Sequence, residues 1–179
     1  MRWDSLVLHE RIGSVGLRAS RTFPPCPNLS PHFPAPRMPL NIALVQKSWV
    51  TVRALGPAAG ELFYKNLFEM SPEAKPLFAN VDKAAQSMKL MDSLHFAVGK
   101  LNDLPTLVPV LKKMGARHIK YGTLDAHYPL VGAALLHTLS MAMGKDWTPE
   151  TKTAWTKVYG IVADTMMEGA REAEAAALK

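Results

Sequence analysis

Apolar side chains recur at intervals of three to four residues from Asn41 onward, which is the period of a helix with one buried face. In the first segment these positions are Ile42, Val45, Trp49 and Val52, directly after an asparagine suited to cap the helix. Alternating runs of β-branched residues are almost absent, so strands are not supported. The pattern predicts an all-α domain of about seven helices of unequal length.

Proline and glycine divide this pattern into separate helices. Gly56 and Pro57 end the first helix and begin the second, since proline is well tolerated at a first helical position. By the same rule Pro109 and Pro149 begin two later helices, and Gly122 ends the earlier of these two with a left-handed residue. The expected helices cover residues 42–55, 57–70, 72–78, 83–101, 110–120, 125–143 and 149 onward.

The composition fits one globular domain. Of the 179 residues 48% are hydrophobic, and no apolar run approaches the roughly 18 residues of a membrane span. The single cysteine, Cys26, excludes an internal disulfide and a cysteine-based zinc site. The chain is therefore compatible with a reducing cytoplasm, and we expect a cytoplasmic location with no membrane partner.

The net charge of +6 does not indicate a nucleic-acid partner, because the basic residues are dispersed. The first 37 residues carry five arginines against two acidic residues and so hold half of the excess. After them the only adjacent basic pair is Lys112 and Lys113, and no basic stripe interleaved with aromatic residues occurs. A solvated basic surface is the preferred interpretation.

Residues 1–37 differ in composition from the rest. Residues 24–36 hold six prolines, which exclude a regular helix or a central strand. Residues 1–37 are a disordered appendage, a targeting segment, or upstream sequence translated from too early a start, with Met38 as the natural first residue. The apolar run 6–8 is too short for a secretory signal. We interpret residues 1–37 as a disordered or non-native extension and residues 38–179 as the domain.

His118 is the main candidate for chemistry, because it stands near the C-terminal end of a helix and offers a neutral imidazole nitrogen. A single helical histidine is more often a satisfied or solvated side chain than a ligand, so its surroundings decide. Gln86 lies 32 residues earlier, and Leu90, four residues further on, shares its helix face. Tyr64 and Phe78 precede them. Each of these four also has a plain interpretation. Tyr64, Phe78 and Leu90 would be core packing, and Gln86 would be an exposed side chain.

Six short strings, in order and with helix-compatible spacing, resemble the globin family. They are most similar to its single-domain bacterial haemoglobins and to the globin domains of flavohaemoglobins. The similarity covers roughly residues 40–168. It implies a globin fold around a haem pocket. The strings are LFYKNLF (62–68), PLF (76–78), QSMKLM (86–91), RH (117–118), HYPLVG (127–132) and AWTKVYG (154–160).

By this resemblance His118 is the proximal ligand of haem iron, and its second ring nitrogen donates to a backbone carbonyl about one turn earlier. Phe78 matches the residue that stacks on the porphyrin, and Leu90 the apolar residue above the iron. Arg117 matches a position that reaches a haem propionate, with a solvated arginine as the alternative.

The proximal side departs from the pattern of some relatives, which place a tyrosine and a glutamate behind the histidine. Tyr128 and Tyr159 match tyrosines found there. Ala170 falls where one relative has the glutamate, and Glu168 is displaced by half a turn. A strongly anionic histidine with peroxidase-like chemistry is therefore not expected.

Tyr64 and Gln86 resemble the distal pair, whose hydroxyl and amide donate to the partial negative charge of iron-bound dioxygen. One such donor in a dry pocket is worth about 1.5–3 kcal/mol, or roughly 10–150-fold in ligand retention. A slip of one residue would put Ser87 at the site in place of Gln86.

The resemblance thus implies a protein with haem b (iron protoporphyrin IX) that reversibly and tightly binds dioxygen at ferrous iron, as in oxygen transport. The alternative is a nitric oxide dioxygenase that detoxifies nitric oxide. It would need an external reductase, because no reductase domain lies within these 179 residues. A haem-based ligand sensor is a third interpretation, and a haemless helical protein the plainest. We expect a monomer or a weak homodimer.

Overall fold

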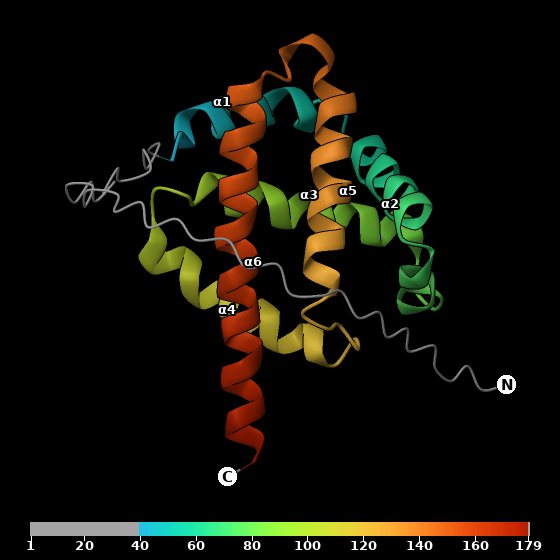
Figure 1. Ribbon diagram of the computed structural model, residues 1–179, viewed down its shortest axis with the longest axis vertical. Helices are drawn as coiled ribbons and strands as arrows, with labels where there is room; N and C mark the ends of the chain where they lie inside the picture. Colours follow the sequence, from blue (N-terminus) through green and yellow to red (C-terminus); the bar gives the residue numbers. More distant parts are fainter. Residues whose placement is uncertain (1–39, 179) are drawn as a thin grey trace, which may run out of the picture. The chain divides into compact units, whose positions relative to one another are not determined.

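The computed structural model describes residues 40–178, which form six α-helices and two short 3-10 helices and no strand (Figure 1). This confirms the all-α prediction. The expected extension, residues 1–37, lies outside the described residues. The elements are α1 (Ile42–Arg53), α2 (Pro57–Met70), η1 (Pro72–Phe78), α3 (Lys83–Gly99), α4 (Leu104–Ile119), α5 (His127–Met143), η2 (Gly144–Asp146) and α6 (Pro149–Ala177).

Side-chain caps define where several helices begin. Asn41 Oδ1 accepts a hydrogen bond from the backbone N–H of Leu44 at 3.0 Å, as the sequence predicts. Asp82 caps α3 and Thr148 caps α6 in the same way. Each cap satisfies a backbone donor that the first turn of a helix leaves without a partner.

The predicted start of α4 at residue 110 is wrong, because the helix already begins at Leu104. The Asp103 side chain accepts from the backbone N–H of Thr106 at 3.3 Å, and Pro105 occupies the first turn, where no N–H is needed. Pro109 therefore lies inside the helix. The bond that Pro109 cannot make would reach the carbonyl of Pro105, an exposed residue whose oxygen water can solvate.

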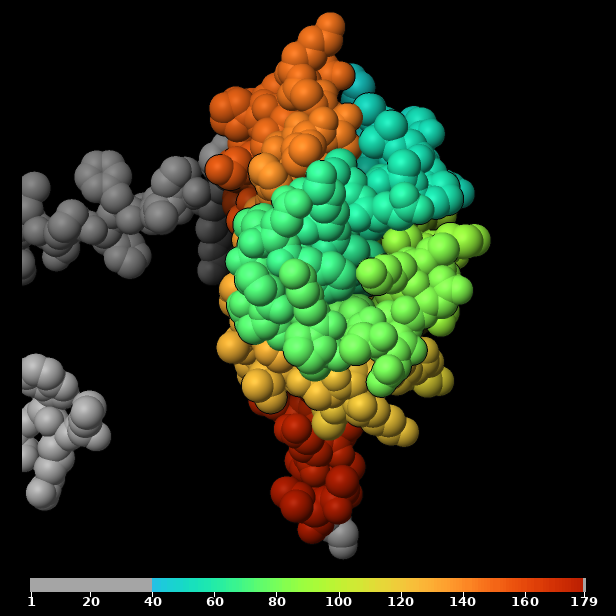
Figure 2. All heavy atoms as spheres, turned by 90° about the vertical axis from the view of Figure 1, so that its right-hand side faces the viewer, coloured from blue at the N-terminus to red at the C-terminus, as the bar shows by residue number. Residues whose placement is uncertain are grey.

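The helices enclose one core, with α5 and α6 side by side and α4 crossing α6 (Figure 1). Figure 2 shows α2, η1 and the start of α3 covering one face, and the end of α6 projecting beyond α4 and α5.

Two hydrogen bonds between side chains join helices that are distant in the sequence. Trp155 Nε1 on α6 donates to Ser48 Oγ on α1 at 2.9 Å, and the buried Asn66 Nδ2 donates to Thr138 Oγ1 at 2.9 Å. None of the described helices is long and apolar enough to cross a membrane.

Candidate functional site

A cavity of about 270 Å³ lies among these helices, and α2, η1, α3, α4, α5 and α6 all contribute to its lining. Most of the lining side chains are apolar, so the few polar groups that face the cavity stand out. The candidate residues from the sequence that line it are Tyr64, Phe78, Gln86, Leu90, His118, Tyr128 and Tyr159. Arg117 is exposed and does not line the cavity, so the structure does not bring this candidate to the site.

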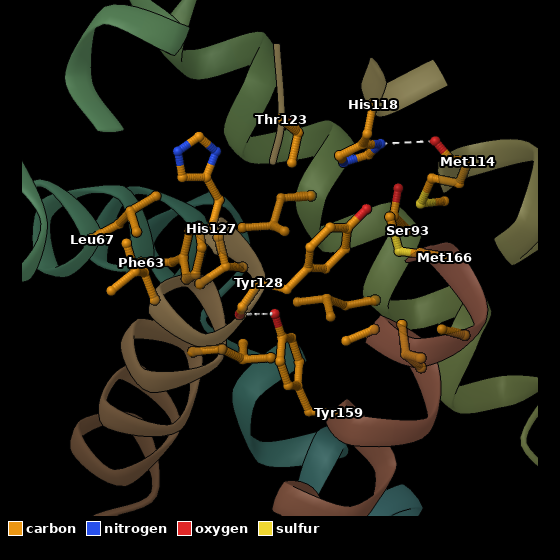
Figure 3. Close-up of a pocket in the computed structure, with 18 of the residues that line it drawn as sticks. Phe63, Leu67, Ser93, Met114, His118, Thr123, His127, Tyr128, Tyr159 and Met166 are labelled. Carbon is orange, nitrogen blue, oxygen red and sulfur yellow. Dashed lines mark hydrogen bonds between the residues drawn. The ribbon is translucent and has the colours of Figure 1, made fainter. Parts of the chain in front are cut away.

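The His118 imidazole is held in one orientation by its own helix. Its Nδ1 lies 2.8 Å from the backbone carbonyl oxygen of Met114, one turn earlier (Figure 3). A carbonyl only accepts, so Nδ1 carries the proton in the neutral ring and Nε2 keeps a free lone pair. The Tyr121 ring also packs against the imidazole in an edge-to-face arrangement, with centroids 5.7 Å apart. His118 therefore offers the cavity an oriented nitrogen that can bind a metal.

The chain turns sharply after His118. Gly122 has a φ of +74°, which favours glycine, and the backbone N–H of Thr123 returns to the His118 carbonyl at 3.2 Å. The turn brings His127 to the same cavity. His127 has the opposite polarity, because its Nδ1 accepts from the backbone N–H of Leu124 at 3.1 Å. In the neutral ring its Nε2 then carries the proton and donates, so His118 is the better candidate ligand.

Tyr64 and Gln86 bring hydrogen-bonding groups to the cavity from α2 and α3. Burial raises the pKa of Tyr64, and a hydrogen bond from the Gln86 amide partly offsets the rise. The hydroxyl therefore stays protonated at neutral pH. The Tyr64 ring is fixed by Phe78, whose centroid is 5.2 Å away at an angle of 64°, and by Phe63 at 5.1 Å.

Gln86 rather than Ser87 lines the cavity. Ser87 is only 1% exposed, because it packs where α3 crosses α2 at Gly60. A Cβ on Gly60 would lie 2.8 Å from the Ser87 carbonyl oxygen. This close crossing fixes the register of α3 and so decides which of the two side chains reaches the cavity.

The two tyrosines that the resemblance assigns to the proximal side, Tyr128 and Tyr159, line the same cavity from α5 and α6. The Tyr159 hydroxyl donates to the backbone carbonyl of Tyr128 at 2.5 Å (Figure 3). Burial raises the pKa of both phenols, so both stay neutral. Glu168 lies at the surface, with Oε1 2.9 Å from Lys112 Nζ. Among the described residues the hydrogen-bond partner of His118 Nδ1 is thus the Met114 carbonyl, and position 170 holds an alanine.

Sequence reasoning missed several residues that line the cavity. Met114 stands four residues before His118 on the same helix face, so the helical period could have found it. Lys89 and Ser93 continue the face of α3 that begins at Gln86. Thr123 and His127 reach the cavity only through the turn at Gly122, and no signal in the sequence indicates their direction. The other lining residues that were not among the candidates are Phe63, Leu67, Ala74, Leu77, Leu94, Ala97, Val98, Leu111, Leu130, Val131, Leu135, Trp155, Val158, Val162, Ala163 and Met166.

Comparison with known proteins gives a consistent result. The family model described as Globin matches residues 61–166. The chain is 29% identical over 128 residues to a protein named flavohemoprotein from Bacillus subtilis (strain 168), which covers 70% of this chain and 32% of that protein. It is 34% identical over 134 residues to anaerobic nitrite reductase HBII of Casuarina glauca, covering 65% and 82%. The similar protein NSHB5 of Oryza sativa subsp. indica, also named anaerobic nitrite reductase, is 29% identical over 135 residues, covering 73% and 93%. The chain thus spans about a third of the flavohemoprotein but most of the two plant proteins.

Proposed function

This chain belongs to the globin family, and we propose that it holds haem b in the cavity and reversibly binds dioxygen at ferrous iron. The observation that carries the proposal is that the His118 imidazole, oriented by the Met114 carbonyl, lines one mainly apolar cavity together with the Tyr64–Gln86 pair. When bound, haem would supply an iron centre that can hold a diatomic ligand.

The residues present fit such a group. His118 provides the nitrogen ligand, and the Met114 carbonyl keeps its ring from turning away. Phe78 and Leu90 supply apolar contact to a flat ring system and keep water out of the cavity. Low water access favours reversible ligand binding, because it protects ferrous iron from oxidation.

The Tyr64–Gln86 pair would retain the ligand through a short relay. The Gln86 amide donates to the Tyr64 oxygen, which leaves the Tyr64 proton free to donate to the ligand. A donor bonded in this way is polarised and donates more strongly. Because the raised pKa keeps the hydroxyl protonated, the donor is present throughout the neutral range.

A second candidate function is enzymatic. The similar plant proteins are named as nitrite reductases, and the chain spans most of their length. Reduction of nitrite to nitric oxide and water consumes one electron and two protons. Oxidation of nitric oxide by retained dioxygen to nitrate is the other enzymatic alternative. Sustained turnover in either reaction needs an electron donor, which we propose is an external reductase.

The purified full-length chain supplied with haemin tests the primary proposal. We expect a Soret band, and a reversible change of spectrum when the reduced protein is exposed to oxygen and then degassed. A chain that takes up no haemin would contradict the proposal. Irreversible oxidation in air, together with catalytic consumption of nitrite or nitric oxide when a reductase is supplied, would favour the enzymatic candidates instead.

A further inference from the structure

Two glycines bring the backbones of α4 and α6 into direct contact. A Cβ on Gly115 would lie 1.8 Å from the carbonyl oxygen of Met166, and a Cβ on Gly169 would lie 2.2 Å from that of Lys112. Both obstacles are backbone atoms within helices, which cannot rotate aside as a side chain can. Even one added methyl group must therefore push the two helices apart.

This crossing lies next to the residues that orient His118. Gly115 follows Met114, whose carbonyl holds the imidazole, and precedes His118 by three residues. On the other helix, Met166 contacts Gly115 through its backbone while its side chain lines the cavity. The position of the imidazole is therefore coupled to the separation of the helices at this point.

Ion pairs also join α4 and α6 at this crossing. Lys112 Nζ lies 2.9 Å from Glu168 Oε1 and 2.6 Å from Glu172 Oε1, and these two acids flank Gly169 on α6. The two acids raise the pKa of Lys112, so the amine remains charged. The charges fix which turn of α6 faces Lys112, whereas the glycines fix how closely the helices approach.

We propose that Gly115 and Gly169 are positioning residues that set the height and tilt of the His118 imidazole toward the cavity, and thereby the strength of its bond to the proposed haem iron. The inference rests on the proposed function for the identity of the group bound. The glycines act through His118 and do not touch that group themselves.

The experiment compares Gly115→Ala and Gly169→Ala with Gly160→Ala. Gly160 is a matched control on α6, because a Cβ there meets no atom within 4 Å. The principal measurement is the iron–imidazole stretching band in the resonance Raman spectrum of the ferrous, ligand-free protein. We expect a shifted band in both crossing variants and about tenfold faster haem loss in Gly115→Ala. Gly160→Ala should keep the wild-type band.

Gly60→Ala distinguishes positioning from general destabilisation, since it crowds the crossing of α2 and α3 instead. It should lose stability and yet keep the wild-type iron–imidazole band. A wild-type band and wild-type haem loss in folded Gly115→Ala would overturn the proposal, and so would an equal shift in Gly60→Ala. If Gly115→Ala does not fold, Gly169→Ala and Lys112→Gln decide in its place, and unchanged bands in both would overturn it.

Failure of this inference can be separated from failure of the proposed function. If the wild-type chain takes up no haem, the proposed function fails. The His118 ring can still be followed by nitrogen NMR in the haem-free chain, where Gly115→Ala should weaken the Nδ1 bond to Met114 and shift its resonance. An unchanged resonance would show that the crossing does not position the ring.

Discussion

The two walls of the cavity hold their functional groups by different means. The His118 wall, formed by α4 and the part of α6 that it crosses, orients one imidazole with a backbone carbonyl and a contact between two backbones. The Tyr64 wall, formed by α2 and α3, places two side chains that bond to each other and rest on aromatic rings. The first wall is determined mainly by main-chain geometry, and the second mainly by side-chain chemistry.

This difference indicates which properties a substitution on each wall would alter. A substitution on the Tyr64 wall exchanges one hydrogen-bonding group for another and leaves the helices in place. A substitution at the crossing on the His118 wall moves a helix and so changes the ligand position without altering the ligand. We therefore expect ligand affinity to be adjusted through Tyr64 and Gln86, and attachment of the cofactor to depend on α4.

The largest expected effect is that of His118→Ala. Loss of the nitrogen ligand should reduce haem affinity by about a hundredfold or more, measured as haem transfer to a scavenger protein. Added imidazole should occupy the space left by the side chain and restore a six- or five-coordinate spectrum. Normal haem retention without imidazole would place the ligand elsewhere and end the distinction between the two walls.

Tyr64→Phe should have the next largest effect. It removes one donor to a charged acceptor, so oxygen should dissociate roughly 10–150-fold faster in stopped-flow measurements. Haem retention should remain close to that of the wild type. Tyr128→Phe is the control, because it removes the hydroxyl of another buried tyrosine that lines the same cavity, from α5. Equal acceleration in both variants would contradict a specific role for Tyr64.

Gly60→Ala should cost about 1–3 kcal/mol of unfolding free energy in urea, because the new methyl group meets the Ser87 backbone. It should also alter oxygen dissociation by shifting Gln86. Gly160→Ala should instead leave stability unchanged or raise it by about 0.5–1 kcal/mol, since alanine favours the helix and meets no obstacle. Equal stability of the two variants would mean that α2 and α3 adjust freely at their crossing.

The smallest effect expected is that of Tyr159→Phe, which loses one hydrogen bond to Tyr128 and about 1 kcal/mol at pH 7. The pKa of Tyr159 is raised by folding, so above about pH 10 the unfolded chain releases a proton that the folded chain retains. Stability then falls by about 1.4 kcal/mol per pH unit for this group. The variant lacks this dependence, so its deficit should shrink between pH 10 and 11 in urea titrations. A constant deficit would contradict the buried position of the phenol.

Sequence predicted the helical class well because its signals are local. Asn41 before an apolar period defines α1 without any knowledge of the partners. The start of α4 was predicted wrongly because three residues in that region are each acceptable at a helix start. They are Asp103, Pro105 and Pro109. The structure resolves this through the Asp103 cap.

The same contrast between local signals and long-range packing applies to the candidate site. Sequence could name His118, Tyr64 and Gln86 as candidates because their types and spacing match a known pattern, and all three line the cavity. The close approaches at Gly115 and Gly169 could not be predicted, because a helical glycine alone does not reveal what lies opposite. Arg117 was placed by resemblance, but its side-chain direction depends on packing that sequence does not specify.

The hydrogen bond from Trp155 to Ser48 has a consequence for biosynthesis. It joins residues 107 positions apart, and the helix that carries Trp155 also contributes Tyr159, Val162 and Met166 to the cavity. At ordinary translation rates α1 waits roughly 5–20 s for this partner to leave the ribosome. During that interval the cavity lacks one side and α1 lacks its anchor. Capture of the cofactor is therefore expected to follow translation of α6, at a step that is sensitive to how much free haem the cell then holds.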